Sequence, residues 1–221
     1  MSFSSVFPFL NDPSLGFIGL DCETSGVSLQ NGHVLIQAGL AGFSSDNSLQ
    51  IFSSLAKPSE SFPWDESSAE IHGISKVSLE SAPSYEIVDS NACAFINRLY
   101  PDLDYSSDLS SLENESKRTL YAVGFNVGSF DFLFFDKFLP STLAMFSHRT
   151  VDLNSLCLLL HDLPFEGQAR SWLEWKVLAK NNATVFLSDN GITGLEHDAG
   201  FDAALALGCF FFLRSVLSSL K

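Results

Sequence analysis

The stretch Phe17–Gly26 reads FIGLDCETSG, and its pattern is that of a buried strand that ends in a turn. A short apolar run leads into Asp21 and Glu23, and a Thr-Ser-Gly turn follows. Side chains two residues apart on a strand point to the same face, so these carboxylates should project together. Adjacent carboxylates repel each other and are costly to bury unless a cation lies between them. The stretch therefore predicts half of a site for a hard divalent metal ion.

The composition indicates a folded protein with an acidic surface. The chain has 221 residues, 46% of them hydrophobic, which suits a single domain over residues 1–221 with a large core. The formal net charge is −14, from 12 basic against 26 acidic residues, which argues against long-range attraction of a polyanion. Any affinity for nucleic acid would therefore have to come from metal ions, stacking and local basic residues.

Several features predict an intracellular, cytoplasmic protein that does not engage a membrane. The longest apolar run, residues 203–213, is too short for a membrane span. The N-terminal MSFSSVFPFLNDPS has no basic segment before its apolar residues, so we expect no secretory signal. The cysteines are far apart and form no C-x-x-C pair, which favours reduced thiols over disulfides or a zinc site. They are Cys22, Cys93, Cys157 and Cys209.

The expected elements follow the order β-β-β-α-β-α-β-α, which is typical of one α/β domain with a mixed sheet. Further strands are expected over residues 33–43, 48–56, 119–125 and 149–151. Helices are expected over residues 83–100, 130–138 with Ser129 as cap, 153–160 with Asp152 as N-cap, 171–180 and 199–220. Residues 181–196 are expected to form a loop. Residues 101–118 are acidic, Ser-rich and poor in apolar residues, which predicts a surface insertion.

Two later stretches carry acids that could complete the metal site. In VGFNVGSFDFLFFD, residues 123–136, a strand should end near Phe125 and Asp131 should fall in the first turn of the next helix. In EHDAGFDA, residues 196–203, His197 and Asp202 are five residues apart, which on one helix would separate them by about 140°. They converge more easily if His197 precedes the helix, Asp198 caps it and Asp202 lies on it.

Together these motifs resemble the three exonuclease motifs of the DnaQ-like, or DEDDh, 3′–5′ exonucleases. D-x-E-T-x-G at residues 21–26, N-x-x-x-F-D at residues 126–131 and H-x-A-x-x-D at residues 197–202 occur in the family's order. The third motif is the histidine version, because the tyrosine version would need Tyr at the position of Asp198. The resemblance covers roughly residues 16–213. It implies a ribonuclease H-like α/β fold, with a mixed five-stranded sheet flanked by helices.

The resemblance also implies a site for two divalent metal ions and a general base. The implied ligands are Asp21, Glu23, Asp131 and Asp202, and His197 is the implied base. Two divalent ions about 3.5–4 Å apart can activate a water and stabilise the leaving 3′-oxygen of a phosphodiester. Oxygen ligands favour Mg²⁺ or Mn²⁺ over zinc. Histidine suits the proton transfer because an imidazole titrates near neutral pH.

Substrate contacts are expected at the turn after the first strand. The backbone from Thr24 to Val27 could approach the terminal nucleotide, because Gly26 leaves room, and Val27 would pack on the base. The other candidates for this pocket are Asn126, Phe130 and His72. Asn126 could instead hold the end of its strand, and Phe130 suits the core equally well.

The local basic residues and the remaining sequence do not decide which nucleic acid is the substrate. Arg170, Lys176 and Lys180 precede the third motif and are the best group for a phosphate backbone, although such groups more often form a solvated face. The second motif has three residues between Asn126 and Phe130 where many family members have two. Together with the acidic insertion and the low basic content, this departure concerns the substrate rather than the chemistry.

Each motif alone is common in proteins where it has no function, but the three in order favour an enzyme. We expect a 3′–5′ exonuclease that acts on single-stranded DNA or RNA 3′ ends and releases nucleoside 5′-monophosphates. One alternative is a non-catalytic binding module of the same fold, for instance a subunit of a nucleic-acid-processing assembly. Another is a phosphoesterase for small nucleotides. A protein partner or a homodimer is compatible with each of these hypotheses.

Overall fold

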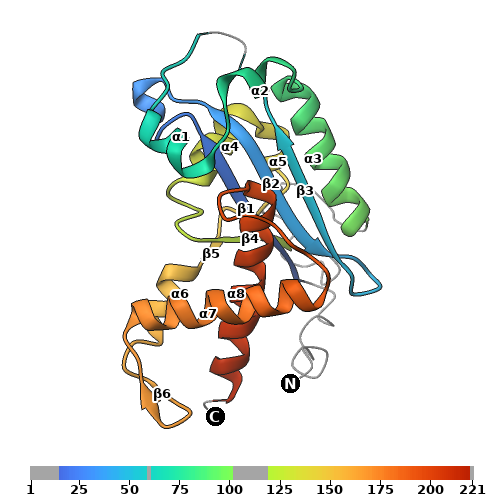
Figure 1. Ribbon diagram of the computed structural model, residues 1–221. Coiled ribbons are helices and arrows are strands. Elements are labelled where there is room, and N and C mark those ends of the chain that lie inside the picture. The colour runs from blue at the N-terminus through green and yellow to red at the C-terminus, as the bar shows by residue number, and fades with distance from the viewer. Residues whose placement is uncertain (1–14, 59–60, 102–118, 220–221) are drawn as a thin grey trace.

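The computed structural model describes residues 15–58, 61–101 and 119–219, and a mixed five-stranded sheet forms its centre (Figure 1). The strand order is β3-β2-β1-β4-β5. β2 is antiparallel to both β1 and β3, whereas β4 is parallel to both β1 and β5. The strands are β1 (Leu15–Thr24), β2 (Leu35–Phe43), β3 (Leu49–Leu55), β4 (Thr119–Gly124) and β5 (Thr150–Asp152). The predicted strands and the mixed sheet are confirmed.

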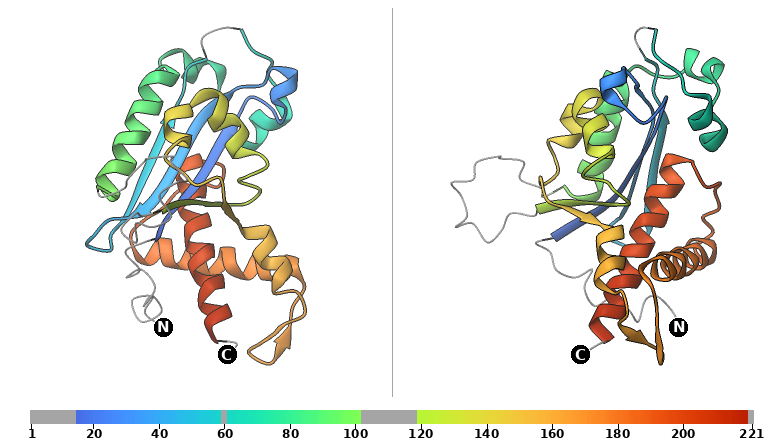
Figure 2. Two further views of the ribbon diagram at one scale, coloured as in Figure 1. Left: turned by 180° about the vertical axis from the view of Figure 1, so that it is seen from behind. Right: turned by 90° about the vertical axis from the view of Figure 1, so that its left-hand side faces the viewer.

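Helices cover both faces of the sheet (Figure 2). One face packs against α3 (Tyr85–Leu99), α4 (Asp131–Phe138) and α5 (Pro140–Leu143). The other packs against α6 (Leu153–Leu159), α7 (Trp172–Asp189) and α8 (Ala199–Ser219). At one end of the molecule lie η2 (Leu29–Asn31), α1 (Glu66–His72) and α2 (Lys76–Glu80); at the other lies a hairpin of β6 (Pro164–Phe165) and β7 (Gln168–Ala169).

Side chains of β1 alternate between two hydrophobic cores. Ile18, Leu20 and Cys22 belong to the core under α3 and α4, whereas Phe17 packs on the core around α7 and α8. Because the alternation has a period of two residues, the acids that flank Cys22 face the α8 side. Cys22, between them, is buried in the opposite core.

α8 lies directly on the sheet because glycines face it. A Cβ atom at Gly19 would come within 1.9 Å of the carbonyl oxygen of Ala203. One at Gly39 would come within 1.9 Å of the carbonyl oxygen of Ala199. The helix backbone therefore rests against the backbones of β1 and β2, which no larger residue would allow. This contact brings the first turn of α8 to the acidic end of β1.

α8 is also long and apolar enough to cross a membrane, by length and composition alone. The sequence predicted no membrane span, because its longest uninterrupted apolar run, residues 203–213, is too short to cross one. However, 67% of its most apolar window is buried inside the protein, as in the core helix of a globular fold.

The helices differ from the sequence predictions at α7 and at the start of α4, and agree with them at the cap of α6. α7 continues to Asp189, so residues 181–189 are helical rather than loop. Ser129 does not cap α4, because its hydroxyl donates to the Asn126 carbonyl and the helix begins at Asp131. Asp152 does cap α6, since its Oδ1 accepts a hydrogen bond from the Ser155 amide at 3.0 Å. Residues 102–118 of the predicted insertion lie outside the described residues.

Candidate metal and catalytic site

The end of β1 carries Asp21 and Glu23 on the face that α8 covers. Glu23 pairs with Gln37 of β2, and the register shifts between Glu23 and Thr24. Such a bulge twists a strand locally and re-aims its side chains, and bulges are common beside active sites. The strand that the sequence singles out therefore ends in two acids and an irregular turn, as predicted.

Asp131 meets β1 from the start of α4. It is the first residue of that helix and only 3% exposed. Its Oδ1 accepts a hydrogen bond from the Cys22 amide of β1 at 3.0 Å. Burial raises the pKa of Asp131 to about 7, against the opposing effect of the hydrogen bonds from Cys22. The second motif thus joins the first through a backbone contact between residues 109 positions apart.

His197 precedes α8 and Asp202 lies in its first turn. The His197 amide donates to Asp202 Oδ2 at 2.8 Å, and His197 adopts a left-handed backbone with φ of 69°. Asp198 caps the helix, because its Oδ1 accepts from the Phe201 amide at 3.0 Å. The predicted arrangement, with His197 before the helix and Asp198 as its cap, is confirmed.

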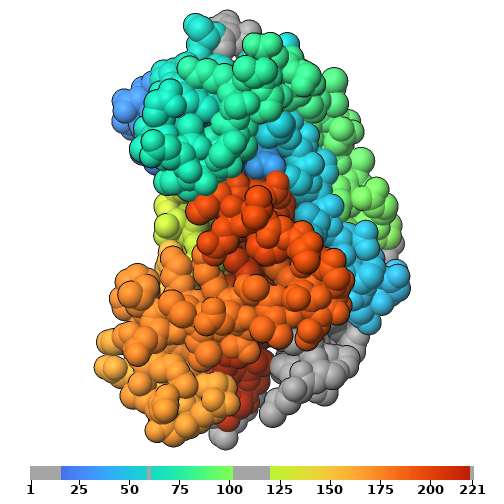
Figure 3. All heavy atoms as spheres, viewed as in Figure 1, coloured from blue at the N-terminus to red at the C-terminus, as the bar shows by residue number. Residues whose placement is uncertain are grey.

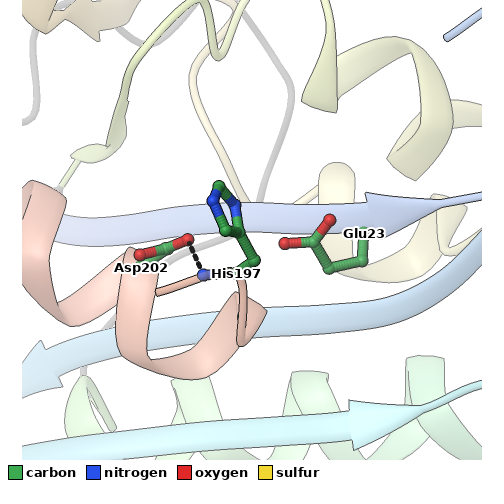
Figure 4. Close-up of side chains that lie close together, drawn as sticks. All are labelled: Glu23, His197 and Asp202. Atoms are coloured by element: carbon green, nitrogen blue, oxygen red, sulfur yellow. Dashed lines mark hydrogen bonds between the residues drawn. The ribbon is translucent and has the colours of Figure 1, made fainter. Parts of the chain in front are cut away.

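Glu23, His197 and Asp202 converge on one point (Figure 4). Each offers a ligand atom, and these atoms all lie within 4.8 Å of one another. His197 is exposed, whereas both carboxylates are partly buried. The segment that leads into α8 lies at the surface, between the α1–α2 region and α7 (Figure 3). The convergence is therefore accessible to a ligand from solvent.

The carboxylates at this end of β1 repel one another. The pKa of Glu23 is raised to about 8, first by burial and then by Asp202 and Asp131. Burial also raises the pKa of Asp21 well above its ordinary value, and the negative charges of Asp131, Glu23 and Asp202 add to the effect. The pKa of Asp202 is likewise raised, chiefly by burial. The positive charge of Lys180, on α7, opposes the shift at both Asp21 and Asp202.

This donor set fits divalent cations. Hard ions such as Mg²⁺ and Mn²⁺ prefer carboxylate oxygens, and a cation between the carboxylates would offset their repulsion and lower their pKa values. Asp21 and Asp131 lie outside the tightest group of ligand atoms, but the charge of Asp131 acts on both Glu23 and Asp21, and the charge of Glu23 acts on Asp21. The chain therefore brings together all five residues that the sequence proposed as ligands and base, and their individual roles stay predictions.

The turn after β1 is shaped by the protein itself. Thr24 and Ser25 are buried, whereas Val27 is 71% exposed. A Cβ atom at Gly26 would come within 2.5 Å of Nε2 of His33. The room that Gly26 leaves is thus filled by the His33 imidazole and is not open to a nucleotide, which corrects the reason that we gave for this glycine. Val27 keeps the exposure that the prediction requires.

His72 ends α1 and faces the same turn. Its Nδ1 accepts a hydrogen bond from the Ile74 amide at 3.0 Å, so the neutral ring carries its proton on Nε2. That Nε2 is buried and has no hydrogen-bond partner within the described part of the chain. Burial and the nearby His197 lower the pKa of His72, while the Thr24 backbone partly opposes this shift. His72 therefore presents a neutral donor near the predicted nucleotide site.

Asn126 and Phe130 have structural contacts of their own. Asn126 has a left-handed backbone with φ of 60°, and its Oδ1 accepts a hydrogen bond from Asn154 Nδ2 at 2.9 Å. The Phe130 ring lies 5.1 Å from the Phe134 ring, between centroids, and packs at the margin of the core under α4. Asn126 thus holds the β4–α4 turn, as one of its two predicted roles required, and Phe130 contributes to the core.

The predicted basic group divides into two parts. Arg170 donates to backbone carbonyls of the β6–β7 hairpin and so holds that hairpin together. Lys180 Nζ lies 3.8 Å from Glu196 Oε1, beside the segment that carries His197. Lys176 Nζ lies 4.7 Å from the ring centroid of Phe125, at the end of β4. Of the three basic residues, Lys180 is the one whose charge acts on the acidic cluster, at Asp21 and Asp202.

Gln37 belongs to the site and was missed by the sequence analysis. Its side chain bonds to Asp198 and to the Ala199 amide, at the start of the helix that carries Asp202. The available signal was a single polar residue inside the apolar strand segment HVLIQAGLAGF.

Solved structures with this fold include nucleases. Exonuclease I of E. coli, in a zinc-bound complex with single-stranded DNA, aligns with a TM-score of 0.57 and 13% identity, over 94% of this chain and 41% of that chain. Its complex with a dT13 oligonucleotide gives 0.56 and 14%, over 92% and 42%. Cell-death related nuclease 4 (CRN-4) gives 0.51 and 13%, over 91% and 64%.

The fold is ribonuclease H-like. The predicted fold class is thereby confirmed, and so is the resemblance of this fold to that of known nucleases. The chain spans less than two thirds of the length of each of these solved chains. No family model matches the sequence, and no curated protein matches it. At such low identity the likeness concerns the ribonuclease H-like fold, and activity has to be argued from the site.

Proposed function

We propose that this chain is a divalent-metal-dependent 3′–5′ exonuclease, which removes nucleoside 5′-monophosphates from single-stranded DNA or RNA ends. The observation that carries the proposal is the convergence of four acids and a histidine, from β1, α4 and the start of α8, at one end of a ribonuclease H-like sheet. Buried acids with raised pKa values are costly to the fold, which supports a functional reason for their retention.

The acids would hold two Mg²⁺ or Mn²⁺ ions. Asp21, Glu23 and Asp202 would bind one ion, and Asp21 and Asp131 the other. When bound, two such ions activate a water for attack on phosphorus and stabilise the charge on the leaving 3′-oxygen. The protein contributes a rigid frame, because Asp131 is fixed by the Cys22 amide and Asp202 by the His197 amide.

His197 acts as the general base in this proposal. Its imidazole is exposed beside Glu23 and Asp202 and can take the proton of the attacking water. The hydrogen bond from its own amide to Asp202 couples the position of the base to a ligand. The backbone that carries the base and the carboxylate of the ligand are therefore held together.

The 3′ end of the nucleic acid would bind over the turn from Thr24 to Val27. Val27 is exposed and would pack on the terminal base. His72 lies beside the same turn, where the Thr24 backbone acts on its imidazole, and is a further candidate for this pocket. The net charge of −14 favours short oligonucleotides or a substrate delivered by a protein partner. We also propose an intracellular setting, with which the four free cysteines agree.

The test is a panel of 5′-labelled DNA and RNA oligonucleotides, with free or blocked 3′ ends, incubated with Mg²⁺, Mn²⁺ or EDTA. We expect stepwise shortening from free 3′ ends only when a divalent ion is present. Asp21→Ala should abolish the reaction, while Asp136→Ala, which removes an exposed acid of α4, should not.

Other outcomes would assign the fold to the alternative functions. Cleavage of small nucleotide esters without cleavage of oligonucleotides would identify a phosphoesterase. Binding of oligonucleotides without hydrolysis under any condition would identify a non-catalytic module. Full activity of Asp21→Ala would contradict the proposed site.

A further inference from the structure

We infer that Gln37 is a positioning residue of the proposed nuclease, whose buried amide fixes His197 and Asp202 relative to Glu23. The inference rests on the proposed function. It concerns a side chain of β2 that belongs to none of the three sequence motifs.

Gln37 is buried and its amide is almost fully used. It is 7% exposed. Its Nε2 donates to Asp198 Oδ2 at 2.7 Å and to Ser53 Oγ at 3.0 Å, and its Oε1 accepts from the Ala199 amide at 3.2 Å. Both amide protons and one acceptor position are therefore occupied, by β3 and by the segment that begins α8. A buried polar group with this many partners specifies one arrangement of those segments.

The segments that Gln37 joins are those that carry the proposed catalytic groups. Gln37 is the register partner of Glu23 in the β1–β2 ladder. Asp198 follows His197 directly, and Ala199 begins the helix that presents Asp202. The second oxygen of Asp198 caps the same helix. Through one amide, the strand pair that holds Glu23 is thus tied to the segment that holds the base and the third ligand.

The backbone at His197 needs such support. Its φ of 69° is a left-handed conformation that residues other than glycine adopt at a cost. The segment has a second restraint on the other side, because Glu196 forms an ion pair with Lys180 at 3.8 Å. That pair is exposed, with side-chain exposures of 65% and 38%, and exposed ion pairs stabilise weakly. The hydrogen bond from Gln37 to the Asp198 carboxylate is partly buried and charge-assisted, so of these two contacts with other elements Gln37 gives the stronger restraint.

A donor–acceptor swap separates positioning from charge. Gln37→Glu replaces the donor with a carboxylate that faces the Asp198 carboxylate. In Gln37→Glu combined with Asp198→Asn, the new side-chain amide at position 198 can donate to the new carboxylate at position 37. The Ala199 amide keeps its acceptor, the helix cap keeps its oxygen, and the Ser53 hydroxyl can donate instead of accepting. The double variant carries the same net charge as the natural chain.

We expect Gln37→Glu to lower kcat about a hundredfold with KM changed little, because displaced catalytic groups cost about that much. Gln37→Met, which removes the hydrogen bonds without adding charge, should behave similarly. The double variant should recover most of the lost rate. Gln50→Glu is the matched control, since it makes the same change on β3, where Gln50 bonds to Ser48.

A second readout does not depend on activity. Hydrogen exchange of the Ala199 and Asp202 amides should accelerate in Gln37→Glu and slow again in the double variant, and calorimetric Mn²⁺ binding should weaken and recover in parallel. If the natural chain cleaves no oligonucleotide while exchange follows this pattern, the proposed function fails and the restraint stands.

The inference is overturned if folded Gln37→Glu keeps the natural kcat. It is also overturned if the double variant recovers neither rate nor amide protection. Thermal unfolding of every variant identifies those that have not folded. If Gln37→Glu does not fold, the double variant is compared with the natural chain by its kcat and by the exchange of its amides.

Discussion

Among residues 15–58, 61–101 and 119–219, acidic side chains are buried in two places, and the two differ in how the chain satisfies them. Asp89 of α3 is 7% exposed. Its Oδ1 accepts from the amide of Thr142 at 2.7 Å and from its hydroxyl at 2.6 Å, and its Oδ2 accepts from the Ser141 amide at 3.0 Å. Asp89 therefore holds the start of α5 and has its partners inside the protein.

The cluster at the end of β1 lacks such partners. Asp131 and Asp202 each accept a hydrogen bond from one backbone amide. Within the described residues, no hydrogen bond reaches the carboxylate of Asp21 or Glu23. Asp21 and Glu23 are partly buried, and carboxylates in such a position need a partner from outside the described chain, such as water or a cation. The difference indicates that Asp89 serves the fold, whereas the β1 cluster has ligand capacity left for a cation.

A large effect on activity is expected at His197. His197→Ala should lower kcat about 10²–10⁴-fold, the usual contribution of a general base, while Mn²⁺ affinity changes little. Calorimetry and single-turnover kinetics on the same samples provide the measurement. His148→Ala, at an exposed histidine elsewhere, is the control. Loss of Mn²⁺ binding together with activity would instead make His197 a metal ligand.

The same substitution in the two acidic sites should have opposite consequences. Asp89→Asn leaves the Ser141 amide without its acceptor and should lower the free energy of unfolding by about 1–3 kcal/mol, with activity per folded molecule retained. Asp21→Asn relieves repulsion and should not lower stability in EDTA, but it should abolish activity. Urea denaturation and the oligonucleotide assay provide both readouts. A loss of stability in EDTA for Asp21→Asn as large as for Asp89→Asn would remove the distinction.

A smaller effect is expected in the pH dependence of the metal-free protein. The folded Glu23 has a pKa of about 8 against the ordinary 4.5, so between these values the folded state holds a proton that the unfolded state has lost. Stability should therefore be highest near the lower value and fall as pH rises toward 8. Asp131, with a pKa of about 7, adds to the fall at lower pH.

Melting temperatures in EDTA from pH 5 to pH 8 test this dependence. The melting temperature of Asp131→Asn should decline less steeply with pH than that of the natural chain. The melting temperature of Asp89→Asn should decline as steeply as that of the natural chain, but from a lower value. A melting temperature that rises over this interval would contradict the crowding of the carboxylates.

The acidic site could be predicted from sequence because each of its parts is a local pattern. Two acids at alternate positions after an apolar run, and an acid at a helix start, place their side chains by backbone geometry alone. The position of His197 before its helix followed from the spacing to Asp202 and from the capping preference of Asp198.

Features that depend on tertiary contacts were not predicted. α7 extends to Asp189 with Ala183, Phe186 and Leu187 buried, a packing contact that the local sequence did not mark as a helix. The role of Gly26 reversed because His33, seven residues later, fills the space beside it. Gln37 carries no motif, and its importance appears only when α8 is laid on Gly19 and Gly39. Each of these features requires knowledge of which segment packs against which.

The most direct test of the account is Mn²⁺ titration calorimetry at pH 7 in two buffers of different ionisation enthalpy. Because Glu23 and Asp131 have pKa values of about 8 and about 7, binding should release protons, and the apparent heats in the two buffers should differ. Asp21→Asn should weaken binding strongly, and Asp89→Asn should bind as the natural chain does. The absence of saturable binding, or equal binding by Asp21→Asn, would contradict a metal site at the end of β1.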